Sequence, residues 1–161
     1  MSTLDLSGWA ALAEIIGTVA VVVSLLLVAY SIKRNTDEME TANSNFLYQL
    51  DADIAGDLSR DVRLATLLLK MEQKEALTDV EKIQYVALQE RYLGMLEIAW
   101  TQYKSGSLAS IDWRDWDKYL SDFVTDGFPK EWWDECRRRY KPGFADHVDS
   151  KYAEILRGLE S

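Results

Sequence analysis

A long apolar segment near the N-terminus is the strongest feature of the hydrophobic pattern. Positions 15–32 carry no charged side chain, and extending the segment back to Trp9 adds only Glu14. A helix over 9–32 rises about 36 Å at about 1.5 Å per residue, which is enough to cross a hydrocarbon core of about 30 Å. Its all-round apolarity argues against the alternative, the central helix of a soluble bundle. The pattern therefore predicts a transmembrane helix over about 9–32.

The residues that flank this segment predict its orientation. Lys33 and Arg34 follow it directly and no Lys or Arg precedes it, while Trp9 and Tyr30 lie near its two ends. Aromatic rings favour the membrane interface, and basic residues are retained in the cytoplasm. We therefore expect a single-pass protein with its N-terminus outside, its remaining chain cytoplasmic, and the lipid bilayer as its first partner. A cleaved signal would carry basic residues ahead of a shorter apolar core.

Beyond the apolar segment, the pattern changes to that of amphipathic helices. Asn35 or Thr36, followed by Asp37 and Glu38, predicts a new helix start, because short polar side chains cap helices and acids suit the first turn. A stripe at helical spacing then predicts one long helix. The members of the stripe are Leu47, Leu50, Ile54, Leu58, Val62, Ala65 and Leu69.

A capping box marks the next helix. Thr78 and Glu81 have the Thr-x-x-Glu spacing, which opens a helix that continues to about Lys104 and ends at Ser105-Gly106-Ser107. The remaining predicted elements are helices over about 112–124, 130–140 and 144–158 and a turn at Asp126-Gly127.

Signals of β structure are missing from the chain. No alternation of apolar and polar residues persists, and the two prolines, Pro129 and Pro142, leave the first 128 residues uninterrupted. The sequence therefore predicts an all-α protein, with one N-terminal transmembrane helix followed by an antiparallel helical-bundle cytoplasmic domain. The predicted parts are residues 1–34, the tail and membrane helix, and residues 35–161, an acidic helical domain.

The charge distribution restricts the partners. The chain has 27 acidic and 18 basic residues, a net charge of −9, and the whole excess lies from Asn35 onward. Such a domain repels nucleic acid, which we exclude as a partner. Cys136 is the only cysteine, so the chain has no internal disulfide.

Small residues recur along one face of the apolar segment. Close approach of backbones through small side chains is a principal way in which helices associate in lipid. This face predicts a seam for self-association into a homo-oligomer, unless the residues merely reflect how common Ala and Gly are in such helices. The predicted seam consists of Ala10, Ala13, Gly17, Ala20 and Ser24.

A neighbouring face carries the one ionisable group of the segment. Glu14 is costly inside a membrane unless it is neutralised, hydrated or paired. It either reaches the headgroups, as an interfacial residue, or faces the axis of a ring of helices as the mouth of a channel. The predicted pore-lining residues are Glu14, Thr18, Val21, Leu25 and Val28.

The last third of the chain is rich in aromatic and basic residues. Most of its rings are expected in the core, but Trp132 and Trp133 cannot both face one core from a helix, so one of them is exposed, covered by another subunit or set at the membrane. The only basic cluster is a candidate contact for an anion or a lipid headgroup. It consists of Arg137, Arg138, Arg139 and Lys141. Pairing with Glu131, Asp134 and Glu135 is the alternative.

Catalytic and metal patterns are weak throughout. The single histidine, His147, lies near Asp146 and Asp149 without a nucleophile motif or a metal-ligand spacing, and no phosphate or dinucleotide glycine pattern occurs. Asp51 and Asp53 begin like a calcium loop, but Val62 stands where the loop needs Glu. We therefore expect no enzyme, no cofactor and no metal.

Several short motifs resemble those of one group of proteins. Glu14-Ile15-Ile16-Gly17 leads into the apolar segment and Ile32 to Thr36 closes it, while Tyr103 to Gly106, Trp132-Trp133 and Tyr140 to Phe144 follow later. The chain resembles bacterial single-pass inner-membrane proteins with a helical cytoplasmic domain and no assigned activity. The resemblance implies a bacterial inner membrane and a helical domain.

These observations leave two functional hypotheses. The first is a membrane-anchored, homo-oligomeric helical binding or scaffold protein whose domain engages a cytoplasmic protein. The second is a homo-oligomeric ion channel or membrane-perturbing effector that the N-terminal helix lines.

Overall fold

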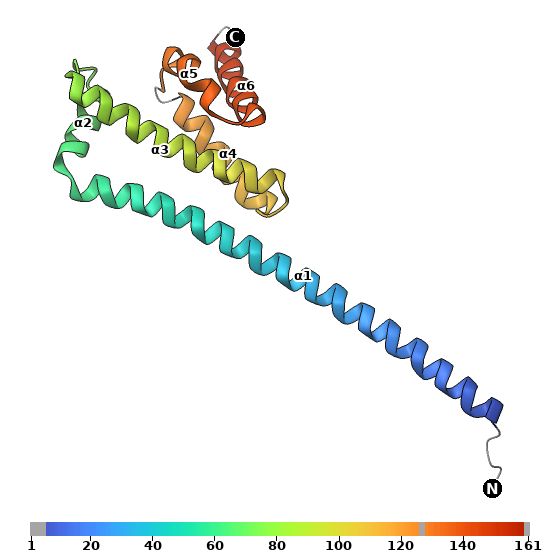
Figure 1. Cartoon of the computed structure of the whole chain (residues 1–161). Helices are drawn as coiled ribbons and strands as arrows, with labels where there is room; N and C mark the ends of the chain where they lie inside the picture. The colour runs from blue at the N-terminus through green and yellow to red at the C-terminus, as the bar shows by residue number, and fades with distance from the viewer. Residues whose placement is uncertain (1–5, 126–127, 160–161) are drawn as a thin grey trace. The chain divides into compact units, whose positions relative to one another are not determined.

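A computed structural model describes residues 6–125 and 128–159, and every regular element in these ranges is a helix (Figure 1). The elements are α1 (Leu6–Arg60), α2 (Val62–Glu72), α3 (Asp79–Lys104), α4 (Ser110–Thr125), α5 (Lys130–Cys136), the 3-10 helix η1 (Arg137–Arg139) and α6 (Pro142–Leu159). The chain divides into two compact units, Met1–Met39 and Glu40–Ser161. The turn predicted at Asp126-Gly127 lies outside the described residues. The all-α prediction is confirmed for the described part of the chain.

Helix α1 continues through the position where a new helix start was predicted. The prediction at Asn35 or Thr36 was wrong, because the Thr36 hydroxyl donates to the backbone oxygen of Ile32 at 3.1 Å instead of capping a helix. Arg34 and Glu38 also form an ion pair at 3.0 Å, four residues apart on the helix surface. These two local interactions stabilise the continuous helix at Asn35 and Thr36.

The predicted single helix through 47–69 divides at Asp61. Asp61 has an extended backbone, with φ −100° and ψ 102°, and its carboxylate accepts from the backbone N–H of Arg63 at 2.9 Å. Asp61 is therefore the N-cap of α2. The break turns Val62 and Leu69 of the predicted stripe outward and directs Leu67 into the core.

Helix α3 begins and ends where the sequence predicts. The Thr78 hydroxyl accepts from the backbone N–H of Glu81 at 3.3 Å, and the Glu81 carboxylate accepts from that of Thr78 at 2.8 Å, which confirms the capping box. The helix ends at Lys104, after which Gly106 takes a φ of 72° that favours glycine. Its N–H donates to the carbonyl of Tyr103 at 3.0 Å.

The second unit has one hydrophobic core around α3. Helix α3 packs against α2, α4 and α6, and α4 also packs against α6. The segment of α1 within this unit contributes Leu47 and Ile54 and is tied to α3 by the Asp57–Arg91 ion pair at 2.7 Å. The largest fully buried side chains are Trp133, Phe144, Leu47, Leu67, Leu93, Leu96, Leu120 and Val148.

The C-terminal helices broadly match the predicted ranges. The helix predicted over 130–140 ends earlier, at Cys136, and continues as the short helix η1. The guanidinium of Arg137 donates to both Asp146 and Asp149 of α6, at 2.7 Å each. These bonds hold η1 against α6.

Candidate functional site

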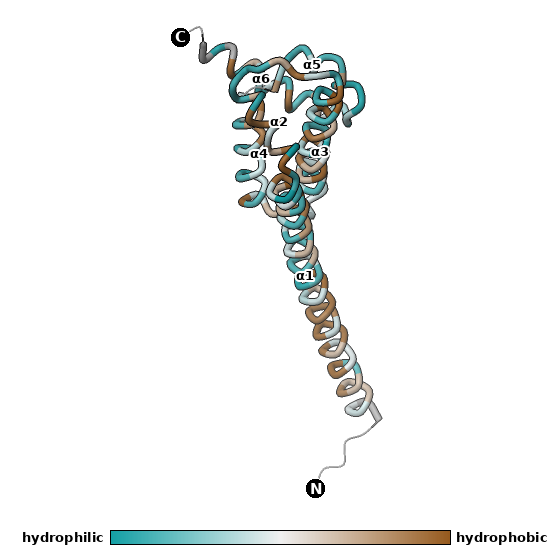
Figure 2. Tube along the Cα trace, turned by 90° about the vertical axis from the view of Figure 1, so that its left-hand side faces the viewer, coloured by the Kyte–Doolittle hydropathy of each residue, from teal (hydrophilic) through white to brown (hydrophobic). Residues whose placement is uncertain are grey.

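The apolar segment of α1 is exposed along its whole length. Every residue from Trp9 to Ile32 is exposed, and the consecutive residues Leu25, Leu26 and Leu27, which point to different sides of the helix, are 63–65% exposed. Figure 2 shows this stretch as the brown part of α1. None of these side chains is buried in this structure, whereas a core helix of a soluble bundle buries most of its apolar side chains. The helix is long and apolar enough to cross a membrane.

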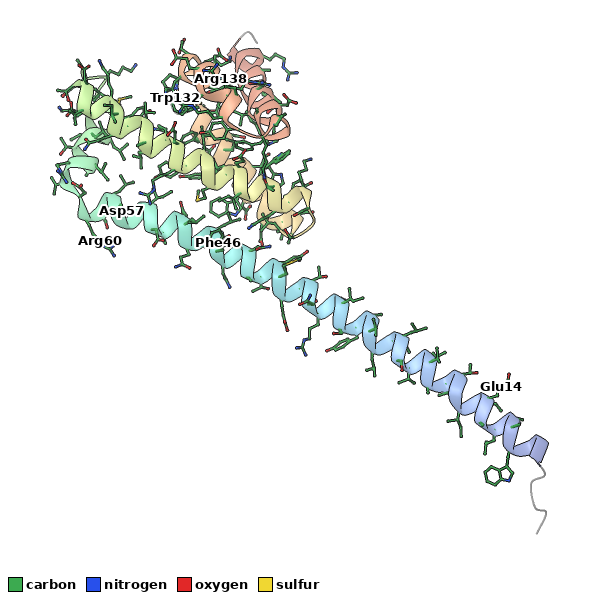
Figure 3. The ribbon with its side chains drawn as sticks, in the orientation of Figure 1. Glu14, Phe46, Asp57, Arg60, Trp132 and Arg138 are labelled. Carbon is green, nitrogen blue, oxygen red and sulfur yellow. The ribbon has the colours of Figure 1, made fainter. Side chains whose placement is uncertain are left out.

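Two hydroxyls within the segment donate to its own backbone. The hydroxyl of Thr18 donates to the carbonyl of Glu14 at 2.9 Å, and that of Ser24 donates to the carbonyl of Ala20 at 2.8 Å. These bonds lower the cost of placing hydroxyls in lipid. The Glu14 carboxylate, in contrast, extends from the exposed helix surface (Figure 3).

The predicted seam and the predicted pore lining both lie on this exposed helix. An added Cβ on Gly17 would meet no atom within 4 Å, so the seam face is open at its centre. Each face would be completed only by further copies of the chain. Self-association and a pore therefore stay predictions.

Two of the four residues of the basic cluster pair with acids other than those that the sequence predicts. Arg137 binds Asp146 and Asp149, and Arg139 binds Glu90. The Lys141 ammonium donates to the Thr101 hydroxyl at 3.0 Å. The expected partner Asp134 pairs with Lys130 instead, because it lies four residues further along α5.

Arg138 and Lys141 form no ion pair among the described residues. The side chain of Arg138 is exposed (Figure 3). Within the described part of the chain, two of the four predicted cations therefore stay without an ion pair, and the anion contact is weaker than the sequence predicts.

The two adjacent tryptophans occupy different environments. Trp133 is fully buried, and its Nε1–H donates to Asp149 at 2.7 Å. Trp132 is half-buried and packs edge-on against Phe128, with ring centroids 4.7 Å apart. Trp132 is therefore covered in part by its own domain.

The single histidine belongs to a cluster that the sequence did not reveal. The Nε2 atom of His147 lies 2.5 Å from Asp117, and the Lys151 ammonium donates to the other oxygen of that carboxylate at 2.7 Å. Burial opposes ionisation of Asp117, but the hydrogen bonds from Lys151 and His147 outweigh it and lower the pKa of Asp117. His147 and Lys151 are one turn apart on α6, whereas Asp117 lies on α4, so only the fold brings the three together. Within the described ranges, no group of three or more potential metal ligands is present.

The outer face of α3 carries exposed apolar side chains. Val80 and Ile83 are 66% and 70% exposed and lie three residues apart on the helix. A hollow of about 370 Å³ begins at Ile83 and is bordered by Glu90 and Arg139. Exposed apolar residues with a polar rim are typical of protein-binding surfaces.

Comparison with family models, curated proteins and solved structures finds no match for this chain.

Proposed function

We propose that the chain is a single-pass membrane protein of a bacterial inner membrane. The segment 9–32 of α1 spans the bilayer, the N-terminus lies outside, and the acidic helical domain is cytoplasmic. One observation carries the proposal: eleven Val, Leu and Ile side chains between positions 15 and 32 are exposed. Transferring these partly exposed side chains to lipid gains on the order of 10 kcal/mol in total. Lys33 and Arg34 then define the cytoplasmic boundary.

The proposed domain is an antiparallel helical bundle. Two hydrogen-bonded contacts support this arrangement. The Asn43 amide donates to the carbonyl of Ser107 at 2.8 Å, and Arg91 binds Asp57. The earlier residue of α1, Asn43, therefore contacts the end of α3, and the later residue, Asp57, contacts the middle of α3, as in an antiparallel pair of helices.

We further propose that the protein is a homo-oligomeric binding or scaffold protein. The open face around Gly17 supports close packing of a second helix, and the acidic excess of the domain favours a cytoplasmic protein with a basic surface. Val80 and Ile83 offer such a partner an apolar anchor.

The mass of the full-length protein in lipid nanodiscs tests self-association. Wild type is expected as one defined oligomer, and the double variant Gly17→Leu/Ala20→Leu as a monomer, because the larger side chains separate the backbones. Ala11→Leu/Ala29→Leu is the matched control, since it makes the same kind of change on nearly the opposite helix face. A monomeric wild type, or equal disruption by both double variants, contradicts the seam.

Photo-crosslinking in cells tests the binding surface. A photoreactive phenylalanine at Ile83 should yield a discrete adduct with one protein. The same group at Ile111, an exposed residue of α4, is the control and should not yield that adduct. No adduct from position 83, or identical adducts from both positions, contradicts a binding surface on α3.

A homo-oligomeric channel or membrane-perturbing effector is the second candidate. One observation favours it: Glu14 is the only charged residue between positions 9 and 32 and is exposed on the helix. In a bilayer it needs water, a proton or a partner, which a ring of copies supplies. Conductance in planar bilayers should fall in Glu14→Gln relative to wild type. Conductance that the substitution leaves unchanged contradicts this lining.

A further inference from the structure

A hollow of about 680 Å³ opens between α2, α3 and α4. Aromatic side chains make up much of its lining, and they are Tyr85 and Tyr92 of α3, Tyr119 and Phe123 of α4, and Phe128. All of them except Phe128 are only half-buried, so part of each ring stays accessible. The hollow is large enough for a small organic molecule.

Four of these rings form a continuous wall. Tyr92 lies between Tyr119 and Phe123, with ring centroids 6.2 and 5.8 Å apart, and Phe123 continues to Phe128 at 5.0 Å. The ring planes in these pairs are tilted by 43°, 45° and 33°, so no pair is stacked face to face. Tilted contacts leave parts of the ring faces uncovered, and these faces attract cations.

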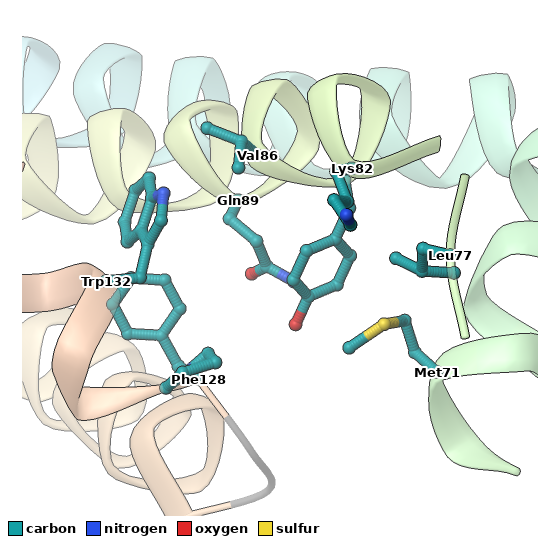
Figure 4. Close-up of a pocket in the computed structure, with 9 residues that line it drawn as sticks. Met71, Leu77, Lys82, Val86, Gln89, Phe128 and Trp132 are labelled. Atoms are coloured by element: carbon teal, nitrogen blue, oxygen red, sulfur yellow. The ribbon is translucent and has the colours of Figure 1, made fainter. Parts of the chain in front are cut away.

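An apolar cavity of about 250 Å³ adjoins the hollow and shares Met71 and Phe128 with it. Figure 4 shows Phe128 and Trp132 on one side of this cavity and Met71 and Leu77 on the other. The accessible atoms of the cavity are apolar. It therefore suits a hydrocarbon group and not a charge.

The charged side chains around the hollow have a negative balance. Glu72 and Asp122 line it, and both are exposed and form no ion pair among the described residues. Lys74 is the one basic residue in the lining of the hollow and is also exposed. Lys82, which lines the adjoining cavity, pairs with Asp79 at 3.1 Å. Two carboxylates against one ammonium leave the hollow with a net negative charge.

A further carboxylate acts on the rings from α1. Burial raises the pKa of Tyr92 and of Tyr119, and the charge of Asp51 adds to both shifts. The negative potential therefore extends to these two hydroxyls. A cation beside the rings gains from this potential as well as from the ring faces, whereas an anion is repelled.

We propose that the hollow binds a substituted ammonium ion that carries an apolar group. The ammonium lies against the rings of Tyr92, Tyr119 and Phe123, near Glu72 and Asp122, and the apolar group enters the adjoining cavity. A quaternary ammonium, whose methyl groups contact ring faces, is the simplest ligand of this class. The inference does not rest on the proposed membrane and scaffold functions, because all of the lining residues belong to the second compact unit.

A pair of probes that differ only in charge tests the ammonium position. Isothermal titration calorimetry compares choline with 3,3-dimethylbutan-1-ol, which has the same shape but carbon in place of the charged nitrogen. The full-length protein is held in uncharged maltoside micelles, and empty micelles are the blank. Wild type should bind choline saturably and about tenfold more tightly than the alcohol, as expected for a cation held by aromatic rings.

A second pair of probes tests the apolar cavity. Hexyltrimethylammonium and tetramethylammonium share the cation and differ in the hydrocarbon chain. Wild type should bind the hexyl compound at least about tenfold more tightly, because its methylene groups leave water. Val86→Phe should abolish this gain and leave the binding of tetramethylammonium unchanged, since Val86 lines the apolar cavity but not the hollow.

Two variants test the groups that hold the cation. Asp122→Asn should weaken the binding of choline about two- to fivefold and leave that of 3,3-dimethylbutan-1-ol unchanged. Asp115→Asn is the matched control, because Asp115 is also an exposed acid of α4 but does not line the hollow, and it should bind both probes as wild type does. Phe123→Leu keeps an apolar side chain but removes one ring, and it should reduce the preference for choline about three- to fivefold.

Several results would overturn the assignment. Heats no larger than those of empty micelles, or equal affinities of wild type for choline and its neutral analogue, contradict a cation site. A preference for choline that neither Asp122→Asn nor Phe123→Leu reduces contradicts its position, and a hexyl gain that persists in Val86→Phe contradicts the place of the apolar group. Unfolding midpoints close to that of wild type show that the variants are folded, and the affinities of wild type decide the matter without any variant.

Discussion

The first turn of α6 lies so close to α3 that one added methyl group should destabilise the domain. A Cβ built on Gly143 falls 2.6 Å from Cη2 and 3.0 Å from Cζ2 of the Trp100 ring. Ordinary contact between carbon atoms needs about 3.5–4.0 Å, so the ring must move by about 1 Å in Gly143→Ala. Trp100 packs edge-on against Phe144 and lies under the ammonium of Lys104 at 5.8 Å, and these contacts resist the movement.

The size of the effect follows from two opposing contributions. Overpacking of this kind costs about 1–3 kcal/mol, whereas replacing glycine in a helix gains up to about 1 kcal/mol. We expect Gly143→Ala to lower the free energy of unfolding by about 1–2 kcal/mol. Gly94→Ala should raise it by about 0.5–1 kcal/mol, because a Cβ on Gly94, within α3, meets nothing within 4 Å.

Urea unfolding of the full-length protein in nanodiscs, followed by tryptophan fluorescence, measures both variants. The transitions should have equal slopes and midpoints displaced in opposite directions from that of wild type. If both substitutions stabilise the domain, the Trp100 ring is not held against Gly143 and the described packing of α6 on α3 is wrong.

Asp117, Asp149 and Cys136, which are partly or fully buried, lead to further predictions. Because hydrogen bonds lower the pKa of Asp117 in the folded state, its stabilisation is complete above its unfolded pKa of about 3.9 and is lost as the pH falls through the lower folded value. Asp117→Asn should lower the free energy of unfolding by about 1–3 kcal/mol at pH 7. Urea midpoints should show that this difference from wild type becomes smaller below about pH 4. A difference that does not change with pH would contradict the link between the protonation of Asp117 and stability. Asp149→Ala should lower the free energy of unfolding by about 2–3 kcal/mol, because it leaves the Trp133 N–H without an acceptor. Asp146→Ala removes only an exposed ion pair and should lower it by under about 1 kcal/mol. Equal losses for the two variants in urea titrations would contradict the Trp133–Asp149 hydrogen bond. Cys136, whose pKa burial raises to about 11, should react with iodoacetamide at pH 8 only as fast as the domain unfolds, as mass spectrometry would show; rapid labelling of folded protein contradicts its burial.

Local signals in the sequence predicted the elements that local bonds determine. The capping box at Thr78 and Glu81 locates the start of α3, because its hydrogen bonds join residues three positions apart. The apolar segment predicts a helix by composition alone. The structure leaves this segment exposed, and its insertion in a membrane stays a prediction.

Local signals in the sequence predicted the wrong helix boundary where a side chain can either cap a new helix or continue the existing one. Thr36 is a good N-cap, but its hydroxyl also bonds the preceding turn, and α1 therefore continues. Asp61 lies in a run that is periodic for a helix, yet it caps a new one. Sequence periodicity does not show which of the two hydrogen bonds is made.

The candidate sites within the domain depend on pairings between distant elements. Asp117 is 30 residues from His147, so no spacing in the sequence identifies their contact. The faces of the apolar segment, in contrast, follow from helical periodicity alone, because all of their residues share one helix.

Sidedness of labelling tests the central claim, that α1 crosses the membrane once, most directly. Single cysteines are introduced by Ser2→Cys or by Ser105→Cys, an exposed position after α3, in a Cys136→Ala background. Spheroplasts are then treated with a membrane-impermeant maleimide. If α1 spans the membrane, position 2 is labelled in intact spheroplasts and position 105 only after lysis, and the protein is retained in the membrane at alkaline pH. Labelling of both positions from the same side, or release by alkali, would contradict a membrane-spanning helix.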